Sequence, residues 1–149
     1  MVLDSRNLIV GSSASMSSVF SNGYPPHLAS YAVDNITDCI YTNVAATQRE
    51  ENPWLRIDLG MMFDVQHVLV YARPDGFEPG RTHNLLTTVS NDEQNHTCGF
   101  YPGPTDLGDR IAVICNNLTR GRYVTLTIQS NSGKKDILQV CEIKVFGKP

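Results

Sequence analysis

Two short groups of residues in this chain combine side-chain types that could bind a ligand, and the first is rich in oxygen. Residues 34–38 (DNITD) place two carboxylates, an amide and a hydroxyl directly before Cys39. Hard cations such as Ca²⁺ prefer about six to eight oxygen ligands from such groups and from backbone carbonyls. Glu142 would add a further carboxylate if a disulfide brought it against this segment. The alternative interpretation is a capped turn, in which Asp34 and Asn35 bond their own backbone.

The second group contains Arg73, Asp75, Phe77 and Arg81, and it follows a Val-rich segment in a stretch with prolines and glycines. Guanidinium groups donate hydrogen bonds in a fixed planar arrangement, which suits the hydroxyls and the ring oxygen of a sugar. The aromatic side chain between them would pack against the apolar face of such a ring. The alternative is a solvated loop whose charges pair with each other.

The sequence lacks the common signatures of catalysis. Its four histidines, at positions 27, 67, 83 and 96, form no HExxH pair, and neither a GxSxG turn nor a glycine-rich phosphate loop is present. With 12 basic against 15 acidic residues and a net charge of −3, the chain also lacks the basic character of a nucleic-acid-binding protein. Its apolar runs are too short to span a membrane. We therefore expect a binding protein that is not an enzyme and that binds neither nucleic acid nor a membrane.

Cysteines and acceptor sequons indicate an extracellular protein. The four cysteines allow two disulfides with three possible connectivities, and we favour the nested pairing of Cys39 with Cys141 and Cys98 with Cys115. Three Asn-x-Thr sequons begin at residues 35, 95 and 117. Disulfides and N-glycans are features of secreted domains, so we predict a secreted protein or the extracellular domain of a cell-surface protein. The alternative is a cytosolic protein with four free thiols.

The elements that must position these groups are strands. Apolar and polar residues alternate at 55–59, 123–128 and 138–146, mostly apolar runs occupy 65–72 and 111–115, and residues 7–10 make a plausible first strand. Clusters of Gly, Pro, Asn and Ser separate these segments, and no apolar period of 3.6 residues persists. The pattern predicts an all-β sandwich or barrel that forms one domain over residues 1–149.

Five motifs carry a family resemblance in a fixed order along the chain. They are residues 7–11 (NLIVG), 31–34 (YAVD), 52–60 (NPWLRIDLG), 121–124 (GRYV) and 138–145 (LQVCEIKV). Together they resemble the F-type lectin (fucolectin) family, a branch of the discoidin-like, coagulation-factor C-domain-like superfamily. The resemblance extends from Asn7 to Gly147 and implies an antiparallel jelly-roll β-sandwich. It also implies a non-catalytic lectin that recognises fucose-containing glycans.

The resemblance implies the same nested disulfides and a structural Ca²⁺ beside the bond between Cys39 and Cys141. Asp38 would contribute to that site where the family often has Ser. The implied ligands are the side chains of Asp34, Glu142 and Asp38 and the backbone carbonyls of Tyr31, Ile36 and Cys141.

The implied sugar site departs from the family pattern. Arg73 matches the first family arginine and Arg81 the second, with a spacing that is one residue longer. Tyr41 stands where the family has its histidine, so Tyr41 or His83 is the candidate for the missing hydrogen-bonding group. The family's adjacent cysteine pair is replaced by residues 74–78, where Asp75 and Phe77 are candidate contacts.

Two hypotheses follow. The first is a calcium-stabilised lectin domain that binds a glycan, with fucose as the expected sugar, through Arg73, Arg81 and their neighbours. The second is an extracellular receptor or adhesion module of the same fold, which recognises a protein such as a cell-surface glycoprotein. Loss of the family histidine favours the second, and retention of both arginines favours the first.

Overall fold

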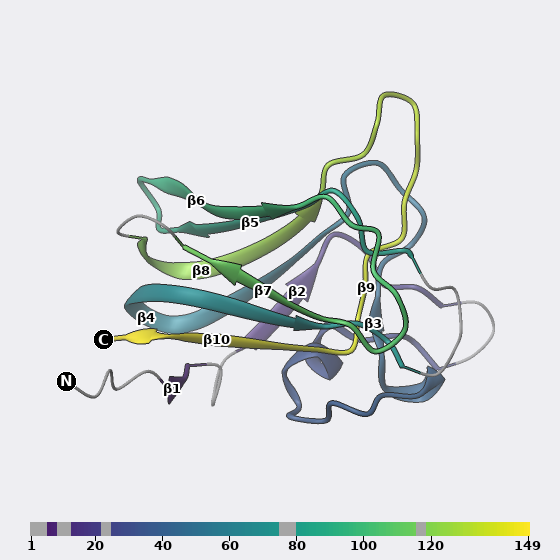
Figure 1. The fold of residues 1–149 in the computed structure, drawn as a ribbon, viewed down its shortest axis with the longest axis horizontal. Helices are drawn as coiled ribbons and strands as arrows, with labels where there is room; N and C mark the ends of the chain where they lie inside the picture. The colour runs from purple at the N-terminus through teal and green to yellow at the C-terminus, as the bar shows by residue number, and fades with distance from the viewer. Residues whose placement is uncertain (1–5, 9–12, 22–24, 75–79, 116–118) are drawn as a thin grey trace.

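The computed structural model describes residues 6–8, 13–21, 25–74, 80–115 and 119–149. Within them the chain is almost entirely β, with two short 3-10 helices (Figure 1). The elements are β1 (Arg6–Asn7), β2 (Ser13–Met16), η1 (Ala29–Val33), η2 (Tyr41–Asn43), β3 (Ala45–Ala46), β4 (Trp54–Tyr71), β5 (Leu85–Ser90), β6 (Asn95–Tyr101), β7 (Arg110–Ile114), β8 (Arg120–Ile128), β9 (Gln139–Val140) and β10 (Glu142–Lys148).

The strands form an antiparallel sandwich, which confirms the predicted fold class. The main sheet runs in the order β1-β10-β4-β8-β5-β6, and β2 and β7 also pair with β4. One layer contains β2, β8, β5, β6 and the first half of β4, while β10, β7 and the second half of β4 form the other (Figure 1). Alternating apolar side chains of both layers meet between them, as Leu55, Val124 and Leu126 do opposite Val70 and Ile143.

Strand β4 corrects one sequence prediction. Residues 55–59 and 65–72 were expected to be separate strands, but they form one 18-residue strand. The pairing with β8 shifts register between Asp58 and Phe63, and Gly60 in this irregular stretch has a φ of +86°, which glycine adopts without strain. Because β4 bends here instead of ending, one strand contributes to both layers of the sandwich.

Two disulfides tie the sandwich together, and both were predicted. The long-range disulfide joins Cys39 to Cys141, and the edge disulfide joins Cys98 on β6 to Cys115 directly after β7. The predicted last strand, 138–146, is split at Cys141 into β9 and β10. Strand β9 pairs with β3 in a separate two-stranded sheet, and this small sheet frames the site described below.

Other predicted elements differ from the structure in detail. Part of the Ser-rich stretch forms β2, and β5 and β6 carried no clear sequence signal. Residues 9–10 of the predicted first strand lie outside the described residues.

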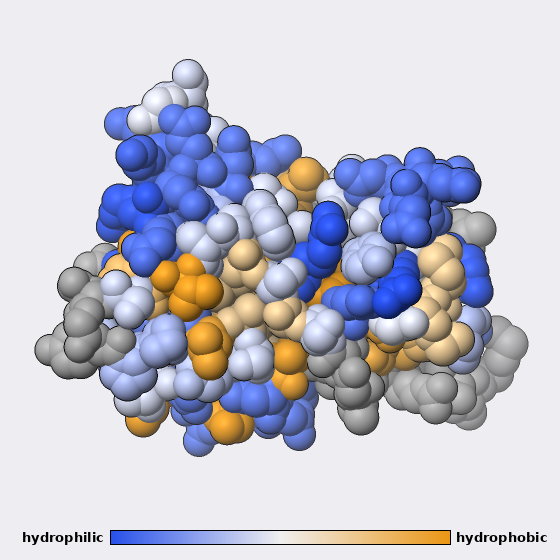
Figure 2. Space-filling model, turned by 180° about the vertical axis from the view of Figure 1, so that it is seen from behind, coloured by the Kyte–Doolittle hydropathy of each residue, from blue (hydrophilic) through white to orange (hydrophobic). Residues whose placement is uncertain are grey.

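Several large apolar side chains are exposed on the described surface. Figure 2 shows them in separate groups among polar residues on the face opposite to that of Figure 1. In the described part of the chain, no helix is long and apolar enough to cross a membrane.

Candidate functional site

A small cavity of about 130 Å³ lies where the two-stranded sheet meets the loops after β4. Its chemistry is mixed, since aromatic rings form one part of the wall and cationic and amide groups form another. The lining residues are Phe20, His27, Tyr41, Ala46, Arg73, Arg81 and Gln139. Ligand sites for drug-sized molecules measure roughly 300–1,000 Å³, so this cavity suits at most one small ring or part of one.

Backbone hydrogen bonds fix the aromatic part of the wall. The Phe20 amide donates to the Ala46 carbonyl (2.8 Å), the His27 amide donates to the Phe20 carbonyl (3.0 Å), and the Ala46 amide donates to the His27 carbonyl (3.3 Å). Ala46 also pairs with Gln139 across β3 and β9. Four residues from three distant segments are thus held in one unit, and the cavity is formed before any ligand arrives.

His27 has a defined orientation in this wall. Its side chain is 4% exposed, and its Nδ1 lies 2.9 Å from the carbonyl oxygen of Val44. A carbonyl can only accept, so Nδ1 carries the hydrogen and Nε2 is the acceptor of the neutral ring. The ring meets Tyr41 edge-on, with centroids 4.8 Å apart, and is tilted against Phe20 at 5.6 Å.

The arginines supply the cationic part of the wall. Arg73 follows β4 by two residues and is only 5% exposed, and its guanidinium carbon lies 5.4 Å from the centre of the Tyr41 ring. Arg81 donates from Nη1 to Oε1 of the buried Gln139 (3.1 Å). Stacking and amide contacts of this kind hold each planar donor group in a fixed orientation.

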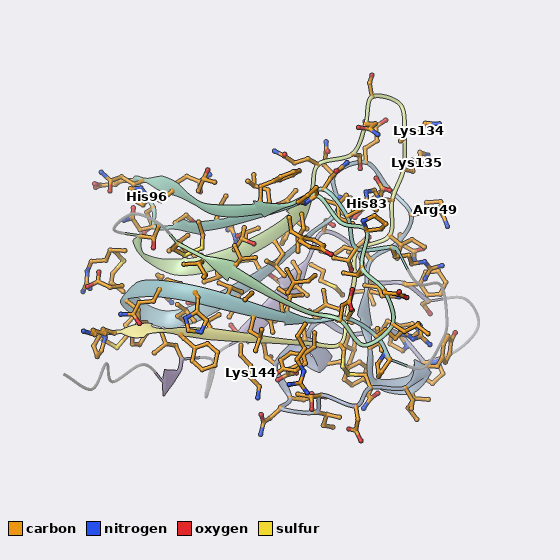
Figure 3. All side chains as sticks on the ribbon, viewed as in Figure 1. Arg49, His83, His96, Lys134, Lys135 and Lys144 are labelled. Atoms are coloured by element: carbon orange, nitrogen blue, oxygen red, sulfur yellow. A yellow bond between two sulfur atoms is a disulfide. The ribbon has the colours of Figure 1, made fainter. Side chains whose placement is uncertain are left out.

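The structure brings together three of the six sugar-site residues proposed from sequence, namely Tyr41, Arg73 and Arg81. His83 does not line the cavity. Its Nε2 lies 2.9 Å from Oδ1 of Asp136, in the loops before β5 where Figure 3 labels it. Asp75 and Phe77 lie outside the described residues.

Sequence reasoning missed the other members of the cavity. These are Phe20, His27, Ala46 and Gln139. His27 and Phe20 lie in the segment that precedes the first cysteine, and Gln139 lies almost at the other end of the chain. No local motif marks them, because only the pairing of β3 with β9 makes them neighbours.

A second locus contains the proposed calcium ligands. Glu142 at the start of β10 has no exposed surface. Its Oε2 accepts a hydrogen bond from the Asn35 amide (2.8 Å), whereas its buried Oε1 has no partner. Asn35 adopts a φ of +64°, and Asp34 Oδ1 accepts from the Ile36 amide (3.0 Å). Asp34 therefore caps its own turn as the alternative interpretation expected, and the segment also lies against Glu142, while the calcium site stays a prediction.

Burial is the main cause that raises the pKa of Glu142 to about 8; the neighbouring Asp34 carboxylate adds to this rise, and the Asn35 hydrogen bond opposes it. A buried carboxylate with an unpaired oxygen beside a second acidic group is costly when it is charged. A divalent cation would remove this cost, so the residues present fit a calcium ion.

Backbone carbonyls of this segment lie against the long-range disulfide. The Ile36 carbonyl oxygen is 3.3 Å from Cys39 Sγ, and the Thr37 carbonyl oxygen is 3.3 Å from Cys141 Sγ. Tyr31 belongs to η1, and Asp38 is exposed. Among the described residues, no three His, Cys, Asp or Glu side chains converge on one point. A cation here would therefore depend on backbone carbonyls as well as on carboxylates.

The fold and the cavity together define a β-sandwich domain of the carbohydrate-binding type. Residues 31–126 match the F5/F8 type C family described as the NedA-like, galactose-binding domain. The chain belongs to this family, and its similarity to fucolectins and to an F-lectin supports the F-type lectin and discoidin-like resemblance.

Several proteins similar to this chain are lectins. Fucolectin-1 of Anguilla japonica is 26% identical over 146 residues, which cover 94% of this chain and 80% of the fucolectin. The F-lectin (fucolectin) from the serum of the striped bass Morone saxatilis superposes with a TM-score of 0.81 at 24% identity, covering 97% of this chain. This chain spans about half (48%) of that lectin.

The lectin domain of lectinolysin, solved with the Lewis b antigen, has a TM-score of 0.77 at 27% identity, covering 97% of this chain and 98% of that domain. The prediction that the chain is not an enzyme agrees with these relatives, which are lectins, and they do not favour the alternative of a protein-recognition module.

Proposed function

We propose that this domain binds the terminal fucose of extracellular glycans in the cavity between Arg73 and the aromatic wall. One observation carries the proposal, which is the convergence of two oriented guanidinium groups and three aromatic rings on one preformed cavity. The similarity to fucolectins and to a lectin domain solved with Lewis b supports fucose as the sugar.

Each part of the cavity has a role in this proposal. Arg73 and Arg81 donate hydrogen bonds to sugar hydroxyls and to the ring oxygen, because guanidinium groups have only donors to offer. Nε2 of His27 accepts from a hydroxyl, which gives the site one acceptor beside its donors. Phe20, Tyr41 and Ala46 face the methyl group and the apolar edge of the ring, where burial of carbon surface adds affinity.

A structural Ca²⁺ would be held by Asp34 and Glu142 together with carbonyls of the loop against the long-range disulfide. When bound, the ion supplies positive charge to the buried carboxylate. Glu142 and the Asn35 amide then fix the loop that leads through Cys39 to Tyr41, and so the loop holds one wall of the sugar cavity in place.

We also place the domain outside the cell. Two disulfides join all four cysteines, a pattern that persists in oxidising compartments. The striped bass lectin comes from serum. Glycans on cell surfaces or secreted glycoproteins are the partners that this location and this cavity suit.

Titration calorimetry with methyl α-L-fucoside tests the proposal. We expect saturable binding that Arg73→Lys weakens about 10-fold or more, because the variant keeps the charge but loses the planar pair of donors. Arg120→Lys is the matched control, since Arg120 is an exposed arginine that pairs with Asp64 away from the cavity. Equal affinities of wild type and Arg73→Lys would show that fucose binds elsewhere, and absence of binding to fucoside and to fucosylated oligosaccharides would refute the function.

A further inference from the structure

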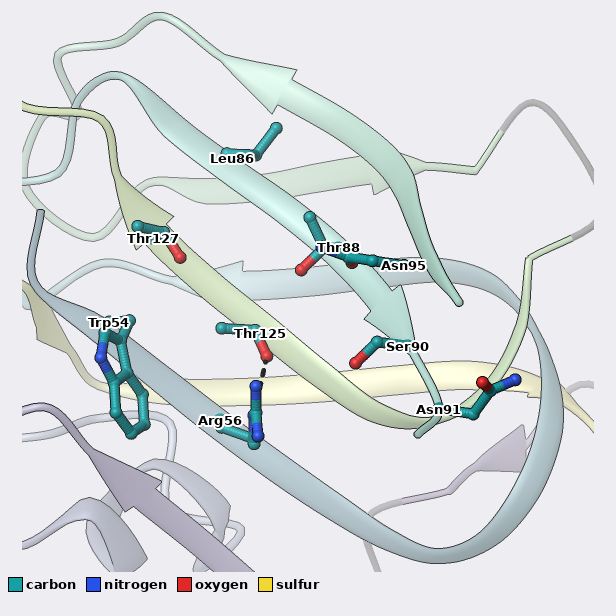
Figure 4. A pocket seen from close by; sticks show the side chains of 9 residues that line it. All are labelled: Trp54, Arg56, Leu86, Thr88, Ser90, Asn91, Asn95, Thr125 and Thr127. Atoms are coloured by element: carbon teal, nitrogen blue, oxygen red, sulfur yellow. Dashed lines mark hydrogen bonds between the residues drawn. The ribbon is translucent and has the colours of Figure 1, made fainter. Parts of the chain in front are cut away.

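A second and larger hollow of about 440 Å³ lies on the outer face of the first sheet layer (Figure 4). Strands β4, β8 and β5 form its floor, and the start of β6 forms one wall. Its lining residues are Trp54, Arg56, Leu86, Thr88, Ser90, Asn91, Asn95, Thr125 and Thr127. We call this hollow the outer groove, and it shares no lining residue with the proposed sugar cavity.

The outer groove has the chemistry of a carbohydrate-binding surface. Most of its lining side chains are hydroxyls and amides, and Trp54 offers a broad ring. Arg56 is held in place, since its guanidinium carbon lies 5.9 Å from the Trp54 ring and 5.3 Å from the Tyr123 ring, and its Nε donates to Thr125 Oγ1 (3.3 Å). Fixed donors beside an aromatic ring suit polar, weakly apolar ligands such as sugars.

Asn95, which lines one wall of the outer groove, belongs to an N-glycosylation sequon. Asn95 begins the sequon Asn95-His96-Thr97, and Asn95 and Thr97 are both exposed. Asn95 pairs with Ser90 and Thr97 pairs with Thr88, so strand alternation directs both side chains to the groove face. Figure 4 shows Asn95 beside Thr88, and Figure 3 shows the neighbouring His96 at the end of the sandwich opposite His83.

The distance from Asn95 to Trp54, at the other end of the groove, is about the length of a short glycan. Ser90, the partner of Asn95, pairs with Tyr123, which in turn pairs with Asp58, four residues from Trp54. Three strand spacings and four residues along a strand place Trp54 roughly 20 Å from Asn95. A chain of several sugar rings attached at Asn95 can therefore reach across the whole groove.

We propose that Asn95 carries an N-linked glycan and that the core of this glycan lies in the outer groove against Arg56 and Trp54. The attachment point keeps the glycan at high effective concentration over the groove, so even weak contacts suffice to hold it there. The covered face would also be shielded from other ligands. This inference rests on the extracellular location given under the proposed function.

The modification needs a polyprenyl pyrophosphate-linked oligosaccharide as the donor, which the secretory pathway supplies. Nδ2 of Asn95 forms a bond to C1 of the first N-acetylglucosamine while the bond from C1 to the pyrophosphate oxygen breaks. The pyrophosphate leaves with the electron pair, and the amide loses one proton.

The test begins with the chain secreted from eukaryotic cells, with Thr37→Ala and Asn117→Gln present throughout to remove the other two sequons. Mass spectrometry of peptides after enzymatic deglycosylation reports the occupancy of Asn95. Thr97→Ala removes the sequon, whereas Thr97→Ser keeps it and is the matched control. Asn95→Gln is the second variant that lacks the acceptor.

Trp54 reports where the glycan lies, because it is the only tryptophan in the chain. We expect Asn95 to be occupied in the parent and in Thr97→Ser, and Trp54 emission to be shielded from acrylamide in both. In Thr97→Ala, in Asn95→Gln and in the parent trimmed by endoglycosidase, we expect a larger quenching constant and a red shift.

Two results would overturn the inference, namely an unmodified Asn95 in the secreted protein, or equal quenching of Trp54 with and without the glycan. Fucoside titration of the same samples separates this test from the proposed function. If the domain does not bind fucoside, the quenching of Trp54 still reports where the glycan lies. If quenching is equal with and without the glycan, the fucoside titration still tests the proposed function.

Discussion

Replacement of Glu142 by glutamine is expected to stabilise the domain in the absence of calcium and to weaken its stabilisation by calcium. Glu142 is fully buried, its Oε2 is bonded to the Asn35 amide, and its Oε1 has no partner. The glutamine side chain keeps the acceptor for Asn35, and its amide nitrogen can donate to Asp34. The variant therefore removes a buried charge and one cation ligand while it retains the shape of the side chain.

The sign follows from the raised pKa of Glu142. The ordinary value is 4.5 and the folded value is about 8, so the protonated form contributes stability that is complete below pH 4.5. This stability is lost as the pH rises from 4.5 through 8. Without calcium, we expect the wild type to lose stability over this window, whereas Glu142→Gln does not.

The raised pKa sets an upper limit on the difference in stability between the two proteins at pH 8. A rise from 4.5 to about 8 corresponds to at most about 5 kcal/mol, and water that reaches the carboxylate reduces this to on the order of 2–4 kcal/mol. For a domain of this size, each kcal/mol shifts the melting temperature by about 2–4 °C. In EDTA at pH 8 we expect Glu142→Gln to melt roughly 5–15 °C above the wild type.

Calcium should reduce or remove the advantage of the variant, because it stabilises the wild type more. An ion present at about 100 times its dissociation constant stabilises the wild type by about 2.7 kcal/mol, and it should stabilise the variant far less. Thermal denaturation followed by circular dichroism gives the melting temperature of both proteins in EDTA and in millimolar calcium, each at pH 5 and at pH 8. A variant that melts below the wild type in EDTA at pH 8, or that gains as much from calcium as the wild type does, would refute the reasoning.

Further predictions concern the two disulfides, two glycines and the wall of the cavity. Serine replacement of both cysteines of the long-range disulfide, whose partners are 102 residues apart, should cost about 4–5 kcal/mol against about 3 kcal/mol for the 17-residue edge disulfide, and the reverse order in urea denaturation would contradict this. Gly147→Ala would place its Cβ 2.1 Å from the Asp64 carbonyl oxygen and should cost about 3 kcal/mol or more in the same assay. Gly133→Ala, which has open space but a φ of +74°, should cost only about 1–2 kcal/mol. His27→Phe leaves the Val44 carbonyl without its donor and should cost about 1–3 kcal/mol while it abolishes calorimetric fucoside binding, so retained binding would exclude His27 from the site.

Much of the fold could be predicted from sequence because its determinants are local. Alternation in residues 123–128 and the apolar run at 65–72 correspond to buried faces of β8 and β4. The bend at Gly60 was not visible, because a glycine within an apolar run can end a strand or allow it to turn. Three of the six residues of strand β5 (Leu85–Ser90) are threonine or serine, so its apolar pattern did not stand out among the loops.

The candidate site was only partly predictable for a different reason. Arg73 and Arg81 lie eight residues apart and share a loop region, so their convergence could be inferred. His27 and Gln139 are 112 residues apart, and they become neighbours only through the pairing of β3 with β9. His83 resembled a spare hydrogen-bonding group, but the fold pairs it with Asp136.

Observation of the arginine side chains during fucose binding tests the central claim most directly. In ¹H–¹⁵N spectra of the labelled domain, the account predicts that methyl α-L-fucoside shifts the Nε–H signals of Arg73 and Arg81 in a saturable manner, and that Arg56 in the outer groove and Arg120 on the far surface do not respond. Saturable shifts at Arg56 with silent Arg73 and Arg81 would contradict it, because the sugar would then bind on the sheet face and not in the cavity.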